Sequence, residues 1–143
     1  MKLATIGYEQ KTLPEMIDQL KKAKVEIVID VRAVAASRRP GFSKTMLGNT
    51  LNQNGIEYLH LRALGTPKEG RIAARAGKID KMHKIMEKQL DTHEAQLELA
   101  HAKEIVGKRR AALLCFEAEA ARCHRTLVAN RICSTLGCKI ENL

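Results

Sequence analysis

The feature that most constrains the fold is an alternation of short apolar runs with longer segments of helical periodicity. We expect strands at about 2–6, 26–31, 56–61, 111–116 and 138–143. Between them the apolar residues recur every three or four positions, which predicts helices at about 12–23, 44–54, 76–90, 91–106 and 120–136. Strands that alternate with helices form a mostly parallel sheet with helices on both faces. The sequence therefore predicts an α/β fold with an open sheet of about five strands.

Local signals mark several helix ends. Thr12 with Glu15 predicts a capping box at the start of the first helix. Asp91 with Glu94 has the pattern of a second capping pair, and Gly137 is expected to end the last helix. These signals indicate where the chain changes direction between the elements of the sheet.

The length of the chain bounds its organisation. At 143 residues it suits one compact domain, so we expect a single domain over residues 1–143. A chain of this size buries about two thirds of its unfolded surface and needs neither disulfides nor a structural metal to fold. No apolar run approaches the roughly 20 residues that span a bilayer, and the apolar part of the N-terminus is too short for a signal peptide. We therefore expect a cytoplasmic protein with no membrane partner.

The four cysteines show no recognisable framework. Cys115, Cys123, Cys133 and Cys138 include no C-x-x-C pair and no zinc-finger spacing. In a cytoplasmic chain all four are expected to be thiols, and no disulfide is expected. Cys133 and Cys138 are expected to be packing residues. Cys123 has the strongest case for reactivity, because it lies near a predicted helix N-terminus among basic residues.

Three kinds of cysteine chemistry can be compared with these spacings. A cysteine phosphatase is excluded, because Arg122 lies one residue too far from Cys115 and the loop between them has no glycine. A rhodanese-like sulfurtransferase shares the segment Ile29–Arg32, but the cysteine loop of that family is absent. A zinc site from His60, Cys115, Cys123 and His124 is chemically possible. Since neighbouring residues of a helix point in different directions, we expect no metal site.

The chain is strongly basic, with a formal net charge of +9. This charge is compatible with an anionic partner such as a phosphorylated metabolite, a nucleic acid or an acidic protein. The aromatic residues number only two tyrosines and two phenylalanines, which leaves little for the base stacking of single-strand binders. Charge alone does not choose among these partners.

Polar residues gather where the predicted strands end. In open α/β sheets ligands bind beyond the carboxyl ends of the strands. We therefore expect the residues at these positions to converge on one edge, as a binding site. The residues expected to bind substrate are Tyr8, Asp30, Arg32, Arg38, Lys44, Cys123 and Arg125.

The same edge holds candidates for proton transfer. Glu117, His124 and His60 are the candidate catalytic residues. Asp30 is expected to orient Arg32, and a purely structural ion pair between them is the alternative. Arg125 is expected to bind an anion together with the backbone amides of a helix N-terminus. The alternative for Arg125 is a structural tie to Glu117 or Asp30.

Seven motifs in order suggest a family. They are Thr5–Glu9, Asp30–Val34, Ser37–Lys44, Gly55–Leu61, Leu64–Lys68, Leu113–Ala118 and Cys123–Arg125. On these motifs the chain resembles the DUF488 family of small bacterial and archaeal proteins of unknown function. Gln10, Ala35 and the pair Glu119–Ala120 depart from its pattern. The resemblance implies an α/β fold and a shared site drawn from the motif residues. It does not indicate a reaction, and the cofactor is unknown.

The function that we predict is a pocket at the strand ends for an anionic ligand, a nucleotide or a phosphorylated metabolite, with a catalytic role left open. The first alternative is a nucleic-acid-associated protein that uses basic surfaces at 38–39, 78–88 and 108–110. The second is a non-enzymatic domain that binds a protein partner. The sequence does not indicate an oligomeric state.

Overall fold

The computed structural model describes residues 1–143 and contains one five-stranded sheet in the order β3-β2-β4-β1-β5. The strands are β1 (Lys2–Gly7), β2 (Ile27–Asp30), β3 (Glu57–His60), β4 (Ala111–Cys115) and β5 (Lys139–Asn142). All four neighbouring pairs are parallel. The predicted α/β fold with a parallel, five-stranded sheet is therefore confirmed.

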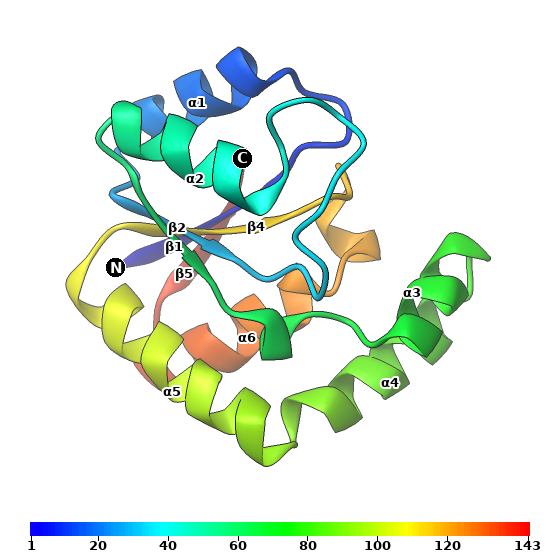
Figure 1. Ribbon diagram of the computed structural model, residues 1–143. Helices are drawn as coiled ribbons and strands as arrows, with labels where there is room; N and C mark the ends of the chain where they lie inside the picture. Colours follow the sequence, from blue (N-terminus) through cyan, green and yellow to red (C-terminus); the bar gives the residue numbers. More distant parts are fainter.

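Helices cover both faces of the sheet, as predicted (Figure 1). The helices are α1 (Leu13–Lys22), α2 (Lys44–Gln53), α3 (Lys68–Arg75), α4 (Ile79–Leu90), α5 (His93–Lys108) and α6 (Arg125–Leu136). Helices α1 and α2 pack on one face, and α4, α5 and α6 contribute to the core on the other. No helix combines the length and the apolarity that a membrane crossing needs.

The alternation of side chains along β4 decides which residues face which core. Ala112 and Leu114 belong to the core under α1 and α2. Ala111, Leu113 and Cys115 belong to the core on the α6 side. Because successive side chains of a strand point to opposite faces, this register directs Cys115 toward the start of α6.

The capping box at α1 is confirmed. The backbone N–H of Glu15 donates to the Thr12 hydroxyl, and the backbone N–H of Thr12 donates to the Glu15 carboxylate at 3.0 Å. The second predicted capping pair is wrong: Thr92, not Asp91, caps α5 by accepting from the backbone N–H of Ala95. A threonine hydroxyl one residue later satisfies the same unpaired donors of the first turn.

Helix α3 was not predicted from the sequence. The prediction has a helix begin near residue 76, whereas α3 covers Lys68–Arg75 and α4 starts at Ile79. Gly70 obscures the helical pattern, yet the packing requires it, because a Cβ there would lie 2.4 Å from Thr66 Cγ2 and 3.3 Å from Ile85 Cγ2. The helix is therefore held by close packing on its neighbours rather than by local propensity.

The expectation of four thiols is wrong for one pair, because Cys133 and Cys138 form a disulfide. Gly137 adopts a positive φ of 71° after the end of α6, and its N–H donates to the carbonyl of Cys133. This left-handed turn folds the chain back, so that the two Cα atoms lie 4.6 Å apart. Cys115 and Cys123 are free thiols, as predicted.

Candidate functional site

The carboxyl ends of the strands meet at one edge of the sheet. Asp30, the last residue of β2, is paired in register with His60, the last residue of β3. Asp30 is also paired with Leu114, one residue before the end of β4 at Cys115. The predicted placement of Asp30, His60 and the segment that leads to Glu117 on one edge is thus confirmed.

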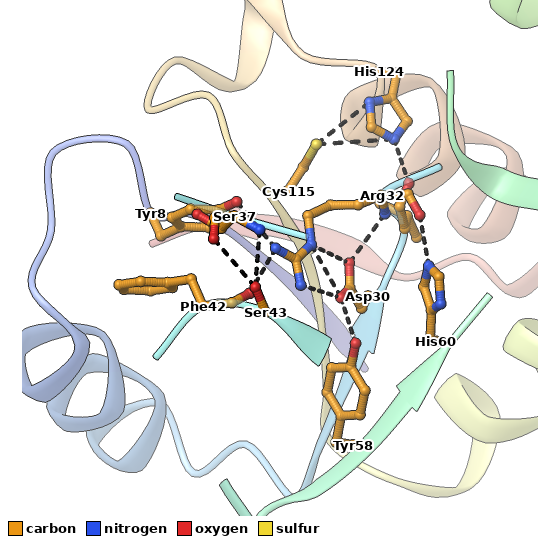
Figure 2. A network of polar contacts seen from close by, with 11 residues as sticks. Tyr8, Asp30, Arg32, Ser37, Phe42, Ser43, Tyr58, His60, Cys115 and His124 are labelled. Atoms are coloured by element: carbon orange, nitrogen blue, oxygen red, sulfur yellow. Dashed lines mark hydrogen bonds and ion pairs between the residues drawn. The ribbon is translucent and has the colours of Figure 1, made fainter. Parts of the chain in front are cut away.

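Asp30 and Arg32 form a buried ion pair at the centre of this edge (Figure 2). The Arg32 Nε and Nη2 atoms donate to the carboxylate of Asp30 at 2.9 and 2.7 Å. The Tyr58 hydroxyl donates to the same carboxylate at 2.5 Å. The remaining Nη1 of Arg32 donates to the Tyr8 hydroxyl and to the Phe42 carbonyl. Each polar atom of the pair therefore has a partner within the protein.

The charges of this network shift the pKa values of its members. Burial acts to lower the pKa of Arg32, but the hydrogen bonds and the charge of Asp30 outweigh it and raise the pKa. Burial and the nearby negative charge of Asp30 raise the pKa of Tyr58. Both groups thus remain protonated, which keeps the network intact.

Two further residues, the predicted site residue His60 and the basic residue Arg39, hold loops in place through hydrogen bonds to backbone carbonyls. The His60 ring donates from Nε2 to the Arg32 carbonyl at 2.7 Å (Figure 2). The Arg39 guanidinium donates to the carbonyls of Tyr8 and Lys11 and lies 4.6 Å from the centre of the Phe42 ring. Arg39 thus holds the loop after β1 against the loop after β2.

A second cluster, which we call the thiol cluster, consists of Cys115, Cys123 and His124. All three side chains are buried. His124 Nδ1 lies 3.6 Å from Cys115 Sγ and 3.8 Å from Cys123 Sγ. The prediction that Cys123 and His124 point in different directions on a helix is wrong. Cys123 is extended, with φ of −120°, and α6 begins only at Arg125, so the two side chains converge.

The tautomer of His124 follows from its backbone partner. His124 Nε2 lies 2.7 Å from the Val31 carbonyl oxygen, which can only accept a hydrogen bond. Nε2 therefore carries a proton. Nδ1 is the ring nitrogen closer to Cys115 Sγ, at 3.6 Å against 4.0 Å for Nε2 (Figure 2), and it lies 3.8 Å from Cys123 Sγ. The ring is held in the orientation in which it can exchange a proton with a thiol.

The pKa values within the thiol cluster move apart. Burial opposes ionisation of Cys123, but the hydrogen bond with Cys115 and the positive charge on His124 lower its pKa well below the usual range. The hydrogen bond with Cys123, together with burial, raises the pKa of Cys115. Burial acts to lower the pKa of His124, but the negative charge of Cys123 outweighs it and raises the pKa. Burial and the charge of Cys123 raise the pKa of Glu117.

Arg125 lies beneath the loop that follows β4. Its side chain is 1% exposed and donates to the carbonyls of Glu117 and Ala118, the first at 2.6 Å. Gly7 leaves room for this crossing, since a Cβ there would lie 1.7 Å from the Glu117 carbonyl oxygen. Arg125 therefore ties α6 to backbone atoms of the loop, rather than to the carboxylate of Glu117 or Asp30.

A cavity of about 760 Å³ opens at this edge of the sheet. Its lining includes five of the predicted site residues: Tyr8, Arg32, Arg38, Glu117 and His124. The other five do not line it: Asp30, Lys44, His60, Cys123 and Arg125. Lys44 is exposed, and the remaining four take part in the contacts described above. The cavity therefore brings together half of the predicted set.

Four lining residues were missed or given another role by the sequence analysis. Arg71 and Arg75 come from α3, Arg122 from the 3₁₀ turn Ala120–Arg122, and Cys115 from the end of β4. The spacing of Arg71 and Arg75 places both on one face of a helix, but this signal is readable only once α3 is recognised. Arg122 lies on a loop whose path depends on the packing of α6.

The remaining basic surfaces differ in how far their charges are paired. The lysines at 78, 81, 84 and 88 are exposed. Arg109 pairs with Glu57 at 2.7 Å, and Arg110 pairs with Glu141 at 3.3 Å. Lys108 pairs with Glu104 at 3.8 Å, so all three residues at 108–110 have a carboxylate partner within the protein.

A family model described as "Domain of unknown function DUF488" matches residues 12–132. Among curated proteins and among solved structures, no match to the chain was found. The matched segment begins after β1 and ends within α6, so it includes every residue of the thiol cluster and of the Asp30–Arg32 pair.

Proposed function

The chain belongs to the DUF488 family, a domain of unknown function, and we propose that its cavity binds a small anionic ligand, either a nucleotide or a phosphorylated metabolite. The observation that carries the proposal is the set of arginines on the lining: Arg38, Arg71, Arg75 and Arg122. None of the four forms an ion pair with a carboxylate of the protein. Arg71 donates one hydrogen bond to the Thr66 carbonyl at 2.9 Å. Guanidinium groups that are not paired with carboxylates are suited to bidentate contacts with phosphate oxygens.

The size of the cavity supports a small molecule. About 760 Å³ lies within the range of roughly 300–1,000 Å³ that small-molecule sites occupy. The arginines come from three separate segments: the loop after β2, helix α3 and the 3₁₀ turn before α6. A ligand that contacts all three segments is enclosed from several sides, which an exposed basic surface does not offer.

The lining also carries apolar groups that favour a nucleotide. Phe116 lines the cavity, is 41% exposed and lies edge-on to Tyr8 at 5.4 Å between ring centres. Its free ring surface can stack on a planar base, while the arginines hold the phosphate. Glu117 and His124 lie at the same cavity and are the groups to which a catalytic role would fall.

The proposal is tested by thermal-shift measurements with nucleotides, sugar phosphates and inorganic phosphate. A ligand present at 100 times its Kd should stabilise the protein by about 2.7 kcal/mol. We expect Arg75→Ala and Arg122→Ala to reduce the shift strongly, because each removes a guanidinium from the lining. Lys84→Ala is the matched control: it removes the same charge from an exposed position that does not line the cavity.

The two alternatives predict different results. If the lysines of α4 bind nucleic acid, Lys84→Ala would weaken retention on an oligonucleotide column in a salt-dependent way, and Arg75→Ala would weaken it no more. If the domain only binds a protein partner, no small molecule would shift its melting temperature. Either result would refute the anion-binding proposal.

A further inference from the structure

The thiol cluster has the composition and the compactness of a metal site. The sulfurs of Cys115 and Cys123 and a ring nitrogen of His124 all lie within 4.8 Å of one another. The three side chains are at most 5% exposed. Two thiolates and one imidazole are a ligand set that favours a tetrahedral, borderline-soft cation, above all Zn²⁺.

The distances within the thiol cluster fit tetrahedral coordination. Zn–S bonds of about 2.3 Å and Zn–N bonds of about 2.0 Å, at the tetrahedral angle, separate sulfur from nitrogen by about 3.6 Å. The observed separations from His124 Nδ1 are 3.6 Å to Cys115 Sγ and 3.8 Å to Cys123 Sγ. The corresponding sulfur–sulfur edge is about 3.8 Å, so the two sulfurs need to approach by no more than about 1 Å. Cys115 Sγ also lies 4.0 Å from Nε2, so it stands beside the ring and not in line with the Nδ1 lone pair. The three ligand atoms are therefore close together, and coordination requires a rotation of the Cys115 or the His124 side chain.

The surrounding contacts are those that support metal ligands. The Nε2–H of His124 donates to the Val31 carbonyl, which leaves Nδ1 free to coordinate. The backbone N–H of Arg125 donates to Cys123 Sγ at 3.5 Å. A hydrogen bond of this kind stabilises a thiolate that is bound to a metal. Both supports come from backbone atoms, so they hold their positions whatever ion is bound.

We propose that Cys115, Cys123 and His124 bind one Zn²⁺ ion, with a fourth coordination position that opens into the cavity. Cys115 and His124 line the cavity and Cys123 does not, so the unfilled vertex of the tetrahedron faces the cavity. Three protein ligands with an open position are typical of catalytic rather than structural zinc. Zn²⁺ also compensates the charge of two thiolates in a buried place, where uncompensated charge is costly.

Glu117 stands beside this open position. Its Oε2 lies 3.4 Å from Cys115 Sγ, and Glu117 lines the cavity together with His124. A carboxylate at this place can accept a proton from a water molecule that is bound to the metal. Zinc binding needs only the three ligands and does not depend on the anion-binding proposal. An anionic ligand bound in the cavity would be close enough to coordinate the metal at its fourth position.

The test is metal titration of the full chain after removal of bound metals with a chelator. Zn²⁺ should bind with a stoichiometry of one per chain, and Co²⁺ should give tetrahedral absorption bands with thiolate-to-cobalt charge transfer. We expect Cys115→Ser and Cys123→Ser each to lower zinc affinity by more than tenfold. The matched control is the double variant Cys133→Ser/Cys138→Ser, which removes the other two sulfurs and should bind zinc as the unaltered protein does.

A second measurement needs no variant. Bound zinc should protect Cys115 and Cys123 from alkylation, as mapped by peptide mass, and the protection should disappear when the metal is removed. Absence of stoichiometric binding, or binding that is lost in the Cys133→Ser/Cys138→Ser control and kept without Cys115 and Cys123, would overturn the site. Inorganic phosphate should alter the cobalt spectrum. If zinc binds and no small ligand alters that spectrum, the open coordination position is refuted. The thermal-shift test of anion binding does not depend on this result.

Discussion

Two clusters lie at the same edge of the sheet and differ in how their polar atoms are used. The Asp30–Arg32 pair, at the end of β2, makes side-chain hydrogen bonds of 2.5–3.1 Å within itself and to the Tyr58 hydroxyl, the Tyr8 hydroxyl and the Phe42 carbonyl. The thiol cluster, which begins at the end of β4, makes only sulfur contacts of 3.4 Å or longer among its side chains and with Glu117. Both clusters reach the cavity, the first through Arg32 and the second through Cys115 and His124. Figure 2 shows the Asp30–Arg32 pair together with Cys115 and His124 of the thiol cluster.

The difference separates residues that maintain the fold from residues that are available for chemistry. A buried ion pair with short, charge-assisted hydrogen bonds is costly to break, because removal of one partner leaves an unpaired charge. A cluster of thiols with an imidazole exchanges weak internal contacts for stronger ones when a metal or a substrate arrives. We therefore expect variants of the Asp30–Arg32 pair to lose stability. Variants of the thiol cluster should lose thiol reactivity or metal binding with little loss of stability.

The largest effect on stability is expected at Asp30. Asp30→Asn keeps the shape of the side chain but leaves the buried Arg32 guanidinium without its counter-charge. Loss of one partner of such a pair costs about 3–5 kcal/mol, to be measured as the free energy of unfolding in urea. The control is Glu57→Gln, which breaks the exposed ion pair with Arg109 and should cost no more than about 1 kcal/mol. Equal losses in the two variants would contradict the structural role of the Asp30–Arg32 pair.

The next effect is expected at Gly7, where β1 passes beneath the loop of the thiol cluster. In Gly7→Ala the added Cβ would lie 1.7 Å from the Glu117 carbonyl oxygen and 2.9 Å from Arg125 Nη1. The loop must shift, at a cost of about 1–3 kcal/mol or more, and zinc affinity should fall with it.

Gly107→Ala provides the matched control for this substitution. Gly107 lies in α5, and a Cβ there meets no atom within 4 Å. Alanine at an exposed helical position should stabilise the protein by up to about 1 kcal/mol. A Gly7→Ala variant that melts like the unaltered protein would show that the loop is not held against β1.

A smaller effect is expected when one hydroxyl is removed from the Asp30–Arg32 network. Tyr8→Phe deletes an acceptor of Arg32 Nη1, but the same nitrogen still donates to the Phe42 carbonyl at 2.8 Å. The free energy of unfolding should fall by about 1 kcal/mol, the usual value of one hydrogen bond. Double-mutant cycles with Asp30→Asn should show coupling between the two positions, because they belong to one network. Additive effects would argue that the network acts as separate contacts.

The smallest effect on stability is expected at Cys115. Cys115→Ser replaces sulfur by oxygen next to Glu117 and His124, which can both bond a hydroxyl. The free energy of unfolding should change by less than about 1 kcal/mol, while reaction with a thiol reagent at this position is lost. A loss as large as that of Asp30→Asn would remove the distinction between the two clusters.

The sequence predicted the edge of the sheet that holds the site but only part of the lining of the cavity. It placed Asp30, His60 and Glu117 at that edge, because strands that alternate with helices run parallel and end together. It missed Arg71 and Arg75, because the glycine at position 70 hides a helix that close packing stabilises. It took positions 123 and 124 for helical neighbours, because the 3₁₀ turn and the extended Cys123 have no local signature.

By itself, then, the sequence determined most of the periodic elements, the parallel direction of the strands and the edge at which polar residues collect. Periodicity is a local property of the chain, and hydrogen bonding between parallel strands leaves few ways to arrange them. Only the tertiary structure decided which polar groups at this edge are satisfied and which are left with weak contacts. Arg32 donates to the Tyr8 hydroxyl and the Phe42 carbonyl, and Arg125 donates to the carbonyl of Glu117. Cys115 contacts the ring of His124. These partners lie 8 to 24 residues apart along the chain, and no local pattern specifies a contact that only packing brings about.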